Sequence, residues 1–163
     1  GIYISMLRPS VAPGRKICRS PMAEFDLKDM VEKRGIADQF VIASAATSTE
    51  EIWNGIGNPV YPPAKEELAK HGISCNGKRA VQLKAADYDI YDYLIGMDEW
   101  NIRNIKRITG GDPEGKIYKF LTFAGSGRDI ADPWYTGNFD ETYRDVLEGC
   151  EGFLDYLRES GMI

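Results

Sequence analysis

The sequence has few of the residues that build metal or disulfide sites. Its 163 residues contain one histidine and three cysteines, Cys18, Cys75 and Cys150. No cysteines and histidines have the spacing of metal ligands, so we expect no metal and no cofactor. An odd number of widely separated cysteines is not typical of a disulfide framework. The sequence therefore favours a reducing compartment, and we expect a cytoplasmic protein.

The chain also lacks an excess of positive charge and long hydrophobic runs. The formal net charge is −5, whereas binding along a nucleic-acid backbone needs a basic footprint, so we expect no nucleic-acid partner. The apolar stretch 1–6 is far too short to cross a membrane, and no signal-peptide pattern is evident, so we expect no membrane partner. A local positive field in an acidic chain can still bind a phosphate group.

The chain does contain short apolar runs that alternate with helical patterns. The length suits one domain over residues 1–163, and the alternation predicts an α/β fold with a parallel sheet and helices on both faces. The predicted strands are 2–7, 40–43, 93–97 and 116–120. The predicted helices are about 20–34, 62–71, a helix capped by Asp98, and 140–158. Residues 48–57 and 123–138 are predicted loops, and the acidic and aromatic stretch 87–93 is interpreted as a solvated turn.

The stretch 17–24 combines several features of an anion site. Ser20 is predicted to cap a helix that has Pro21 at its first position. Backbone N–H groups and the positive end of the helix dipole would then lie beside Arg19, whose planar fork can hold two phosphate oxygens. The alternative is that Arg19 is a surface cation beside an ordinary helix cap.

The same stretch resembles the end of the phosphate-binding loop of the low-molecular-weight protein tyrosine phosphatases. Five later blocks are similar to that family and follow in its order. These blocks are 44–47, 58–64, 71–73, 96–98 and 129–135. The likeness covers about residues 17–158. It implies a four-stranded parallel sheet with flanking helices, and metal-free hydrolysis of phosphotyrosine or small aryl phosphates, so the implied ligand is phosphate or a phosphotyrosine-containing molecule.

The resemblance also implies roles for the loop residues. In that family a cysteine, five residues and an arginine form the loop, and the cysteine attacks phosphorus to give a cysteinyl-phosphate. Arg19 is similar to that arginine, which holds the phosphate and the transition-state charge. The implied phosphate-binding residues are Ile17, Cys18, Arg19 and Ser20. His71 and Asp98 match positions that support the site.

A second loop carries the remaining implied roles. Asp132, directly before Pro133, is similar to the aspartate that protonates the leaving phenolate and then activates water. The aromatic residues that would wall the substrate ring are Trp134, Tyr135 and Trp53. The alternative for these three residues is that they pack on the core edge or lie exposed in loops.

The sequence departs from the family at the nucleophile. Six residues before Arg19 stands Pro13, or Ala12 if the loop carries a one-residue insertion, and neither can attack phosphorus. Cys18 adjoins Arg19, too close for the geometry of the nucleophile. Cys75 and Cys150 belong to other elements and are interpreted as buried small hydrophobic residues.

Several hypotheses remain open at this point. The chain is a phosphatase relative that has lost or impaired activity, or residues 1–16 are not the natural sequence of this fold, for example after a frameshift upstream of Ile17. A third hypothesis is activity rescued by Cys18. From a different class, the chain is a non-catalytic module that binds phosphate or a phosphorylated partner through Arg19 and Ser20.

Overall fold

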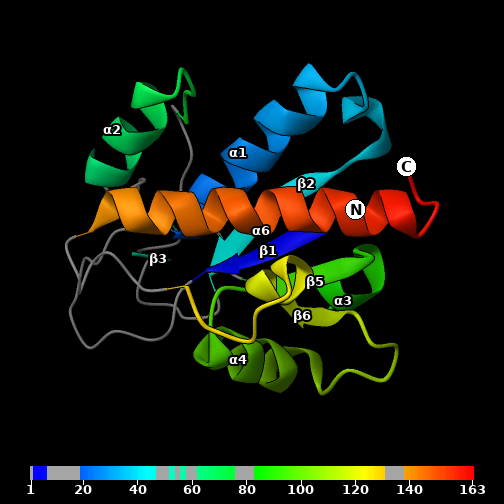
Figure 1. The fold of residues 1–163 in the computed structure, drawn as a ribbon. Coiled ribbons are helices and arrows are strands. Elements are labelled where there is room, and N and C mark those ends of the chain that lie inside the picture. The colour runs from blue at the N-terminus through cyan, green and yellow to red at the C-terminus, as the bar shows by residue number, and fades with distance from the viewer. Residues whose placement is uncertain are drawn as a thin grey trace.

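A parallel sheet lies between two layers of helices in the computed structural model (Figure 1). The structure describes residues 2–6, 19–46, 52–53, 56–57, 62–75, 83–130 and 138–163. Within these ranges the sheet has four strands in the order β2-β1-β5-β6. The α/β class and the parallel sheet are therefore as the sequence predicts.

The strands pair in parallel throughout this sheet. They are β1 (Ile2–Met6), β2 (Ile42–Ala46), β5 (Tyr93–Gly96) and β6 (Ile117–Lys119). Ile2 is in register with Ile42 on one side and with Tyr93 on the other, and Leu94 of β5 pairs with Ile117. Parallel strands end at the same edge of the sheet, which is where such folds bind ligands.

The helices cover the two faces and bury a separate core on each. On one face, α1 (Arg19–Lys33) packs against β1 and β2, and α6 (Phe139–Glu159) packs against α1. On the other face, α4 (Glu99–Thr109) packs against β5 and β6, near the short α3 (Asp87–Ile90). The larger core includes Met22, Phe120 and Phe153, and the smaller includes Leu83 and Ile105. The helix α2 (Pro62–Lys70) contacts both α1 and α6.

The start of α1 differs from the sequence prediction. The helix begins at Arg19, so Ser20 is its second residue and not its cap, and Pro21 is its third. Pro21 is tolerated there because the N–H groups of the first turn have no partner within the helix. The end is as predicted: Gly35 follows with φ of 72°, and Ile36 N–H donates to the Val31 carbonyl.

The second strand and the following loop also differ from prediction. The apolar run 40–43 predicts a strand buried on both faces, but β2 begins at Ile42 and Val41 is 63% exposed. The short 3₁₀ helix η1 (Ala37–Gln39) precedes the run and delays the strand. The predicted loop 48–57 contains an antiparallel pair, β3 (Ile52–Trp53) with β4 (Ile56–Gly57). The missed signal is the Asn54-Gly55 dipeptide between them, which favours a hairpin turn.

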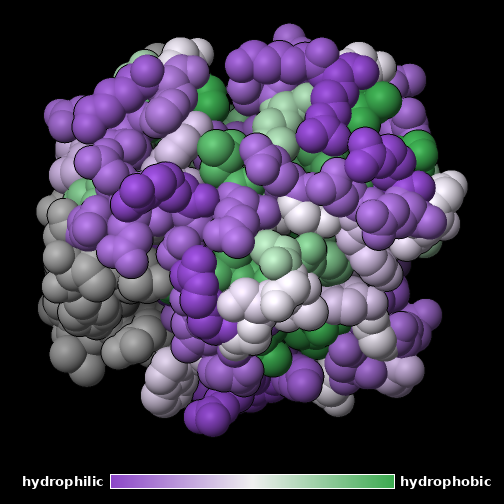
Figure 2. Space-filling model, viewed as in Figure 1, coloured by the Kyte–Doolittle hydropathy of each residue, from purple (hydrophilic) through white to green (hydrophobic). Residues whose placement is uncertain are grey.

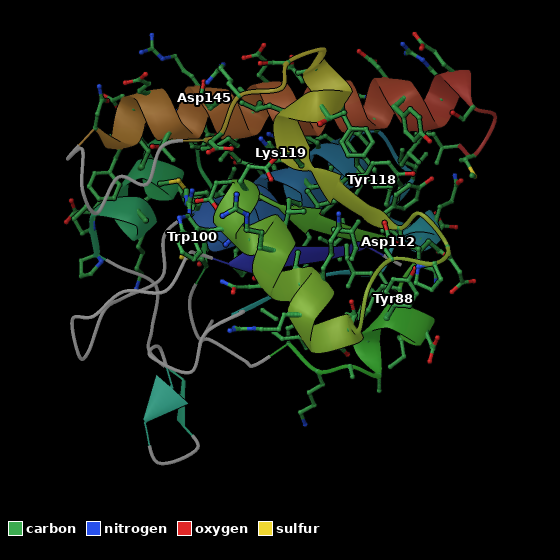
Figure 3. All side chains as sticks on the ribbon, turned by 90° about the horizontal axis from the view of Figure 1, so that it is seen from below. Tyr88, Trp100, Asp112, Tyr118, Lys119 and Asp145 are labelled. Atoms are coloured by element: carbon green, nitrogen blue, oxygen red, sulfur yellow. The ribbon has the colours of Figure 1, made fainter. Side chains whose placement is uncertain are left out.

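The remaining elements need smaller corrections. The strand predicted to reach Phe120 ends at Lys119, because the 3₁₀ helix η2 (Phe120–Ala124) turns the chain into the core. The interpretation of 87–93 as solvated is wrong for Tyr88, which is 6% exposed and donates to Asp112 Oδ1 at 2.8 Å (Figure 3). None of the helices in the described ranges combines the length and apolarity that a bilayer crossing demands.

Candidate functional site

Arg19 lies at the edge where the parallel strands end. It is the first residue of α1, and its side chain is completely buried. Its guanidinium Nη1 donates to Asp98 Oδ2 at 2.9 Å and to the Ile130 carbonyl at 2.6 Å. Both contacts use one terminal nitrogen, so the planar group is held from one side in a fixed orientation.

Asp98 connects Arg19 to the helix after β5. It caps α4 as the sequence predicts, and its Oδ1 accepts from the Asn101 N–H at 2.8 Å while Oδ2 binds Arg19. Asn101 in turn accepts from the Met97 N–H at 2.9 Å. The turn from β5 into α4 is therefore fixed by its own side chains, and the carboxylate of Asp98 is presented to the start of α1.

The segment before residue 131 is anchored to this same point. Ile130 N–H donates to the Met97 carbonyl at 2.9 Å, while its carbonyl accepts from Arg19. The Asp129 carboxylate accepts from the Glu99 N–H at 3.2 Å and pairs with Lys119 Nζ at 2.9 Å. Lys119 also pairs with Glu99 and donates to the Gly127 carbonyl, both at 2.9 Å. The segment thus reaches residue 130 with its backbone fixed.

A second anchor joins the same segment to the last helix. The guanidinium of Arg128 forms a two-pronged contact with Asp145 of α6, with N···O distances of 3.0 and 2.8 Å. In Figure 3, Lys119 lies on β6 and Asp145 lies on α6, the two elements to which this segment is anchored. Paired, parallel hydrogen bonds of this kind add geometric specificity as well as energy.

A buried polar contact joins α1 to β2 behind the site. Glu24 is 3% exposed, and its Oε1 accepts from the Ser44 hydroxyl at 2.6 Å. Its Oε2 pairs with Lys28 at 2.6 Å, one turn further along α1. A buried carboxylate needs such partners, because an isolated charge in the interior is costly. The contact fixes the first turns of α1 against the middle of β2.

The geometry therefore brings three distant segments to one arginine. The stretches 19–24, 96–98 and 129–130 meet at Arg19, and 44 joins through Glu24. A helix N-terminus carries partial positive charge, and Arg19 adds a full one, partly balanced by Asp98. Among the residues that the structure describes, no cluster of side chains could hold a metal ion.

Comparison with known proteins agrees with this arrangement. The family model for low molecular weight phosphotyrosine protein phosphatases matches residues 13–162. The chain belongs to this family. Among curated proteins, the phosphatase YfkJ of Bacillus subtilis (strain 168) is 36% identical over 145 residues, which are 88% of this chain and 90% of YfkJ. PtpA of Staphylococcus aureus (strain MRSA252) is 35% identical over 142 residues, 86% of this chain and 87% of PtpA.

Solved structures give the same family. The crystal structure of YfkJ superimposes with a TM-score of 0.82 at 32% identity, covering 98% of this chain and 94% of YfkJ. The low molecular weight protein tyrosine phosphatase SP-PTP of Streptococcus pyogenes gives 0.76 at 34% identity, covering 96% and 91%. The phosphatase fold predicted from the sequence blocks is therefore confirmed.

Only part of the predicted site falls on described residues. Arg19 is described in full, and Ser20 only as a helical residue of α1. Trp53 is the second residue of β3, and its side chain lies outside the description. The other predicted site residues lie outside the described residues altogether: Ile17, Cys18, Asp132, Trp134 and Tyr135. The predicted nucleophile positions, Pro13 and Ala12, lie outside them as well.

The two described cysteines are buried, as predicted. Cys75 is 3% exposed and Cys150 is fully buried, with its Sγ 3.8 Å from the Ala23 carbonyl. Burial raises the pKa of both thiols, and the effect is greatest for Cys150, where the Asp26 and Glu151 carboxylates raise it further. A thiol whose pKa is raised stays protonated and is a poor nucleophile.

The single histidine, which the resemblance places among the residues that support the site, packs against the last helix. The ring of His71 stacks on Tyr143, with centroids 4.0 Å apart and an interplanar angle of 8°. Tyr143 donates to Asp26 Oδ1 at 3.0 Å, which links α6 to α1. Burial raises the pKa of Asp26 to about 7; the hydrogen bond from Tyr143 opposes this increase and the Asp29 carboxylate adds to it.

Prediction from the sequence did not identify the side chains that fix the segment before Asp132. Lys119, Glu99 and Asp129 come from three separate elements, and nothing in the sequence pairs them. Asp129 did lie in a recognised block, and it stands three residues before the predicted general acid. That spacing was the one available signal that its carboxylate positions the loop.

Proposed function

We propose that this chain is a tyrosine phosphatase family member in which hydrolysis of phosphotyrosine or aryl phosphates is absent or strongly impaired. The observation that carries the proposal is that Arg19 is fixed at the start of α1 while Pro13 stands six residues before it. The family reaction needs a thiolate at that position, and the proline ring or the methyl group of Ala12 offers no electron pair for phosphorus.

The remaining machinery is assigned by the same resemblance. Arg19 and Ser20, with Ile17 and Cys18, would hold the phosphate group, and Asp132 would exchange a proton with the leaving oxygen. Trp53, Trp134 and Tyr135 would wall the aryl ring. Without a nucleophile, Asp132 and Arg19 could stabilise charge, but the covalent phosphoenzyme intermediate could not form.

The other thiols offer little compensation. Cys75 and Cys150 are buried with raised pKa values, so each stays a neutral thiol near pH 7. Cys18 adjoins Arg19, and its sulfur would have to take the place of a nucleophile that stands six residues before Arg19. We therefore expect Cys18→Ser to leave any residual turnover unchanged.

Turnover of para-nitrophenyl phosphate tests the proposal. We expect the chain and its Asp132→Ala variant to release nitrophenol at the same background rate, and Pro13→Cys or Ala12→Cys to raise that rate if the loop can place a thiol. Turnover in the unaltered chain that Asp132→Ala removes would overturn the proposal. Loss of that turnover in Cys18→Ser would then identify Cys18 as the nucleophile.

A second candidate function is phosphate binding without chemistry. The burial of Arg19 at a helix N-terminus favours it, because that position combines a guanidinium with partial positive charge. Calorimetric titration with inorganic phosphate and with phosphotyrosine would measure it. Arg19→Lys keeps the charge but loses the planar fork, so we expect at least a tenfold weaker affinity. Unchanged affinity in Arg19→Lys would contradict this function. The control is Arg103→Lys, which makes the same change at an exposed position of α4.

A further inference from the structure

A groove with an aromatic floor lies between the last helix and the segment after β6. The groove has a volume of about 630 Å³ and runs between η2 and the second half of α6. Its floor consists of Tyr118, Phe123 and Tyr156, which we call the aromatic floor. The Phe123 ring is 5.2 Å from Tyr118 and 5.1 Å from Tyr156, centroid to centroid. In Figure 2, green and white residues interrupt the purple surface where η2 approaches α6 in Figure 1.

All the charged residues that α6 contributes to the wall of this groove are acidic. Glu148, Glu151, Asp155 and Glu159, the acidic stripe, all line it. Their spacing of three, four and four residues places them on one face of the helix. The opposite face of α6, with Val146, Phe153 and Leu157, is in the core. The stripe is therefore a continuous row of carboxylates above aromatic rings.

Among the residues that the structure describes, cations lie near two of the four carboxylates of the stripe. Glu148 is 3.5 Å from Arg128, whose closer partner is Asp145, and Asp155 is 3.0 Å from Arg158. Within the described residues, neither Glu151 nor Glu159 has an ion-pair partner. The stripe thus retains a net negative charge beside a floor whose rings can bind cations on their faces.

The groove continues past the two tyrosines into a second hollow. Tyr118 and Tyr156 also line a neighbouring cavity of about 560 Å³ at the start of β5 and β6. Tyr93 lies there, with its ring centroid 5.9 Å from that of Tyr118 and 6.4 Å from that of Tyr156. Burial raises the pKa of Tyr93 and Tyr118, so both keep their protons and stay neutral near pH 7. The two hollows share Tyr118 and Tyr156 and therefore form one continuous surface.

We propose that this groove is a docking surface for an extended peptide segment with arginine or lysine at alternate positions. Carboxylates four residues apart on a helix repeat about every 6 Å. Alternate side chains of an extended strand repeat about every 6.6 Å on one face. Each cation of such a segment therefore meets a carboxylate of the stripe while its stem, or a guanidinium plane, lies on the aromatic floor. None of the residues that line the groove is among the described partners of Arg19, so the proposal is independent of whether the chain hydrolyses phosphate esters.

Fluorescence anisotropy with a labelled peptide in which arginine alternates with serine tests this proposal. We expect saturable binding, weakened at least tenfold in the double variant E151K/E159K. The matched control is E32K/E66K, which makes the same charge change on exposed residues of α1 and α2 and should bind as the unaltered chain does. Circular dichroism checks that both variants fold.

Peptide controls separate docking from simple charge attraction. A peptide of the same composition with its arginines adjacent should bind at least threefold more weakly, and an alternating glutamate peptide should not bind. Equal binding of both arginine peptides, or equal weakening in both double variants, would overturn the proposal. Sedimentation of the unaltered chain checks self-association: a dimer that E151K/E159K dissolves would overturn it too, because a second copy would then occupy the groove.

Discussion

Two buried charges on α1 are treated in opposite ways by the fold. Arg19, at the first residue, faces the carboxylate of Asp98 and a backbone carbonyl. Asp26, seven residues later, is 1% exposed and has the phenol of Tyr143 as a hydrogen-bond donor, while its Oδ2 has no partner among the described residues. One charge is matched by an opposite charge, and the other only by a dipole.

The N-terminal end of α1, which lies at the candidate site, therefore treats buried charge differently from the middle of the helix. A paired buried charge stays ionised and fixed over a broad pH range, whereas an unpaired carboxylate gains a proton when burial outweighs its hydrogen bonds. The pKa of Asp26 is accordingly raised to about 7. The site end is thus organised by charge pairing, and the middle of α1 carries a group that titrates near neutrality.

Breaking the pair at the site end should have the largest effect. Asp98→Ala removes the carboxylate that pairs with buried Arg19 and removes the cap of α4. We expect a loss of about 3–5 kcal/mol in the free energy of unfolding, measured by urea denaturation. Asp98→Asn keeps a capping oxygen, so it should retain about 1 kcal/mol more than the alanine variant. Equal stability of Asp98→Ala and the unaltered chain would show that Arg19 needs no partner.

Removing the unpaired carboxylate should change how stability depends on pH. The folded pKa of Asp26, about 7, lies above the ordinary value of 3.8, so between about pH 4 and 7 the folded state holds a proton that the unfolded state has lost. Stability therefore falls with rising pH across that window and levels off above it. Asp26→Asn removes this pH dependence. Between pH 4 and 8, the free energy of unfolding of the variant should therefore rise relative to that of the unaltered chain by up to about 4 kcal/mol.

Urea denaturation at several pH values would measure that gain. The matched control is Asp29→Asn, one turn away on α1, where the carboxylate is 30% exposed and pairs with Lys33. Because the Asp29 carboxylate contributes only the smallest part of the increase in the pKa of Asp26, we expect a gain much smaller than that of Asp26→Asn. A stability curve for Asp26→Asn that runs parallel to that of the unaltered chain would mean that Asp26 is ionised in the fold throughout this range.

These two positions also mark what the sequence could and could not predict. Asp98 followed a buried strand and preceded residues at helical spacing, so its capping role was local and could be predicted. Asp26 lies among Met22, Phe25 and Met30, but α1 packs against the sheet, α2 and α6 together. A helix covered on several sides buries charged positions that a single amphipathic face would leave in water, and no local pattern shows this.

The same reasoning applies to the candidate site. The anion-binding character of Arg19 could be predicted from the helix start, but its contacts with Asp98 and Ile130 join residues 79 and 111 positions apart. Such pairs are set by the sheet order, in which β5 lies next to β1. The short hairpin of β3 and β4 was missed for another reason, because its strands are only two residues long and carry little periodic signal.

Loss of the only identified donor to Asp26 should have a smaller effect. Tyr143→Phe keeps the ring on His71 but removes the hydroxyl at 3.0 Å from Asp26. We expect a loss of about 1–2 kcal/mol at pH 8, where the carboxylate is charged, and less at pH 5. The pKa of Asp26 should rise further, which carbon-13 NMR of its carboxyl carbon would measure. A lower pKa in Tyr143→Phe would contradict the role of the phenol.

The smallest effect should come from an ion pair of the same helix that water surrounds. Lys33 pairs with Asp29 at 2.8 Å, and its side chain is 71% exposed. Water and salt screen such a pair, and holding two long side chains in place costs entropy. Lys33→Gln should therefore leave the midpoint of urea denaturation unchanged within error at 0.15 M salt. A resolved loss that disappears at high salt would show that α1 depends on surface charge as well as on the buried pair at Arg19.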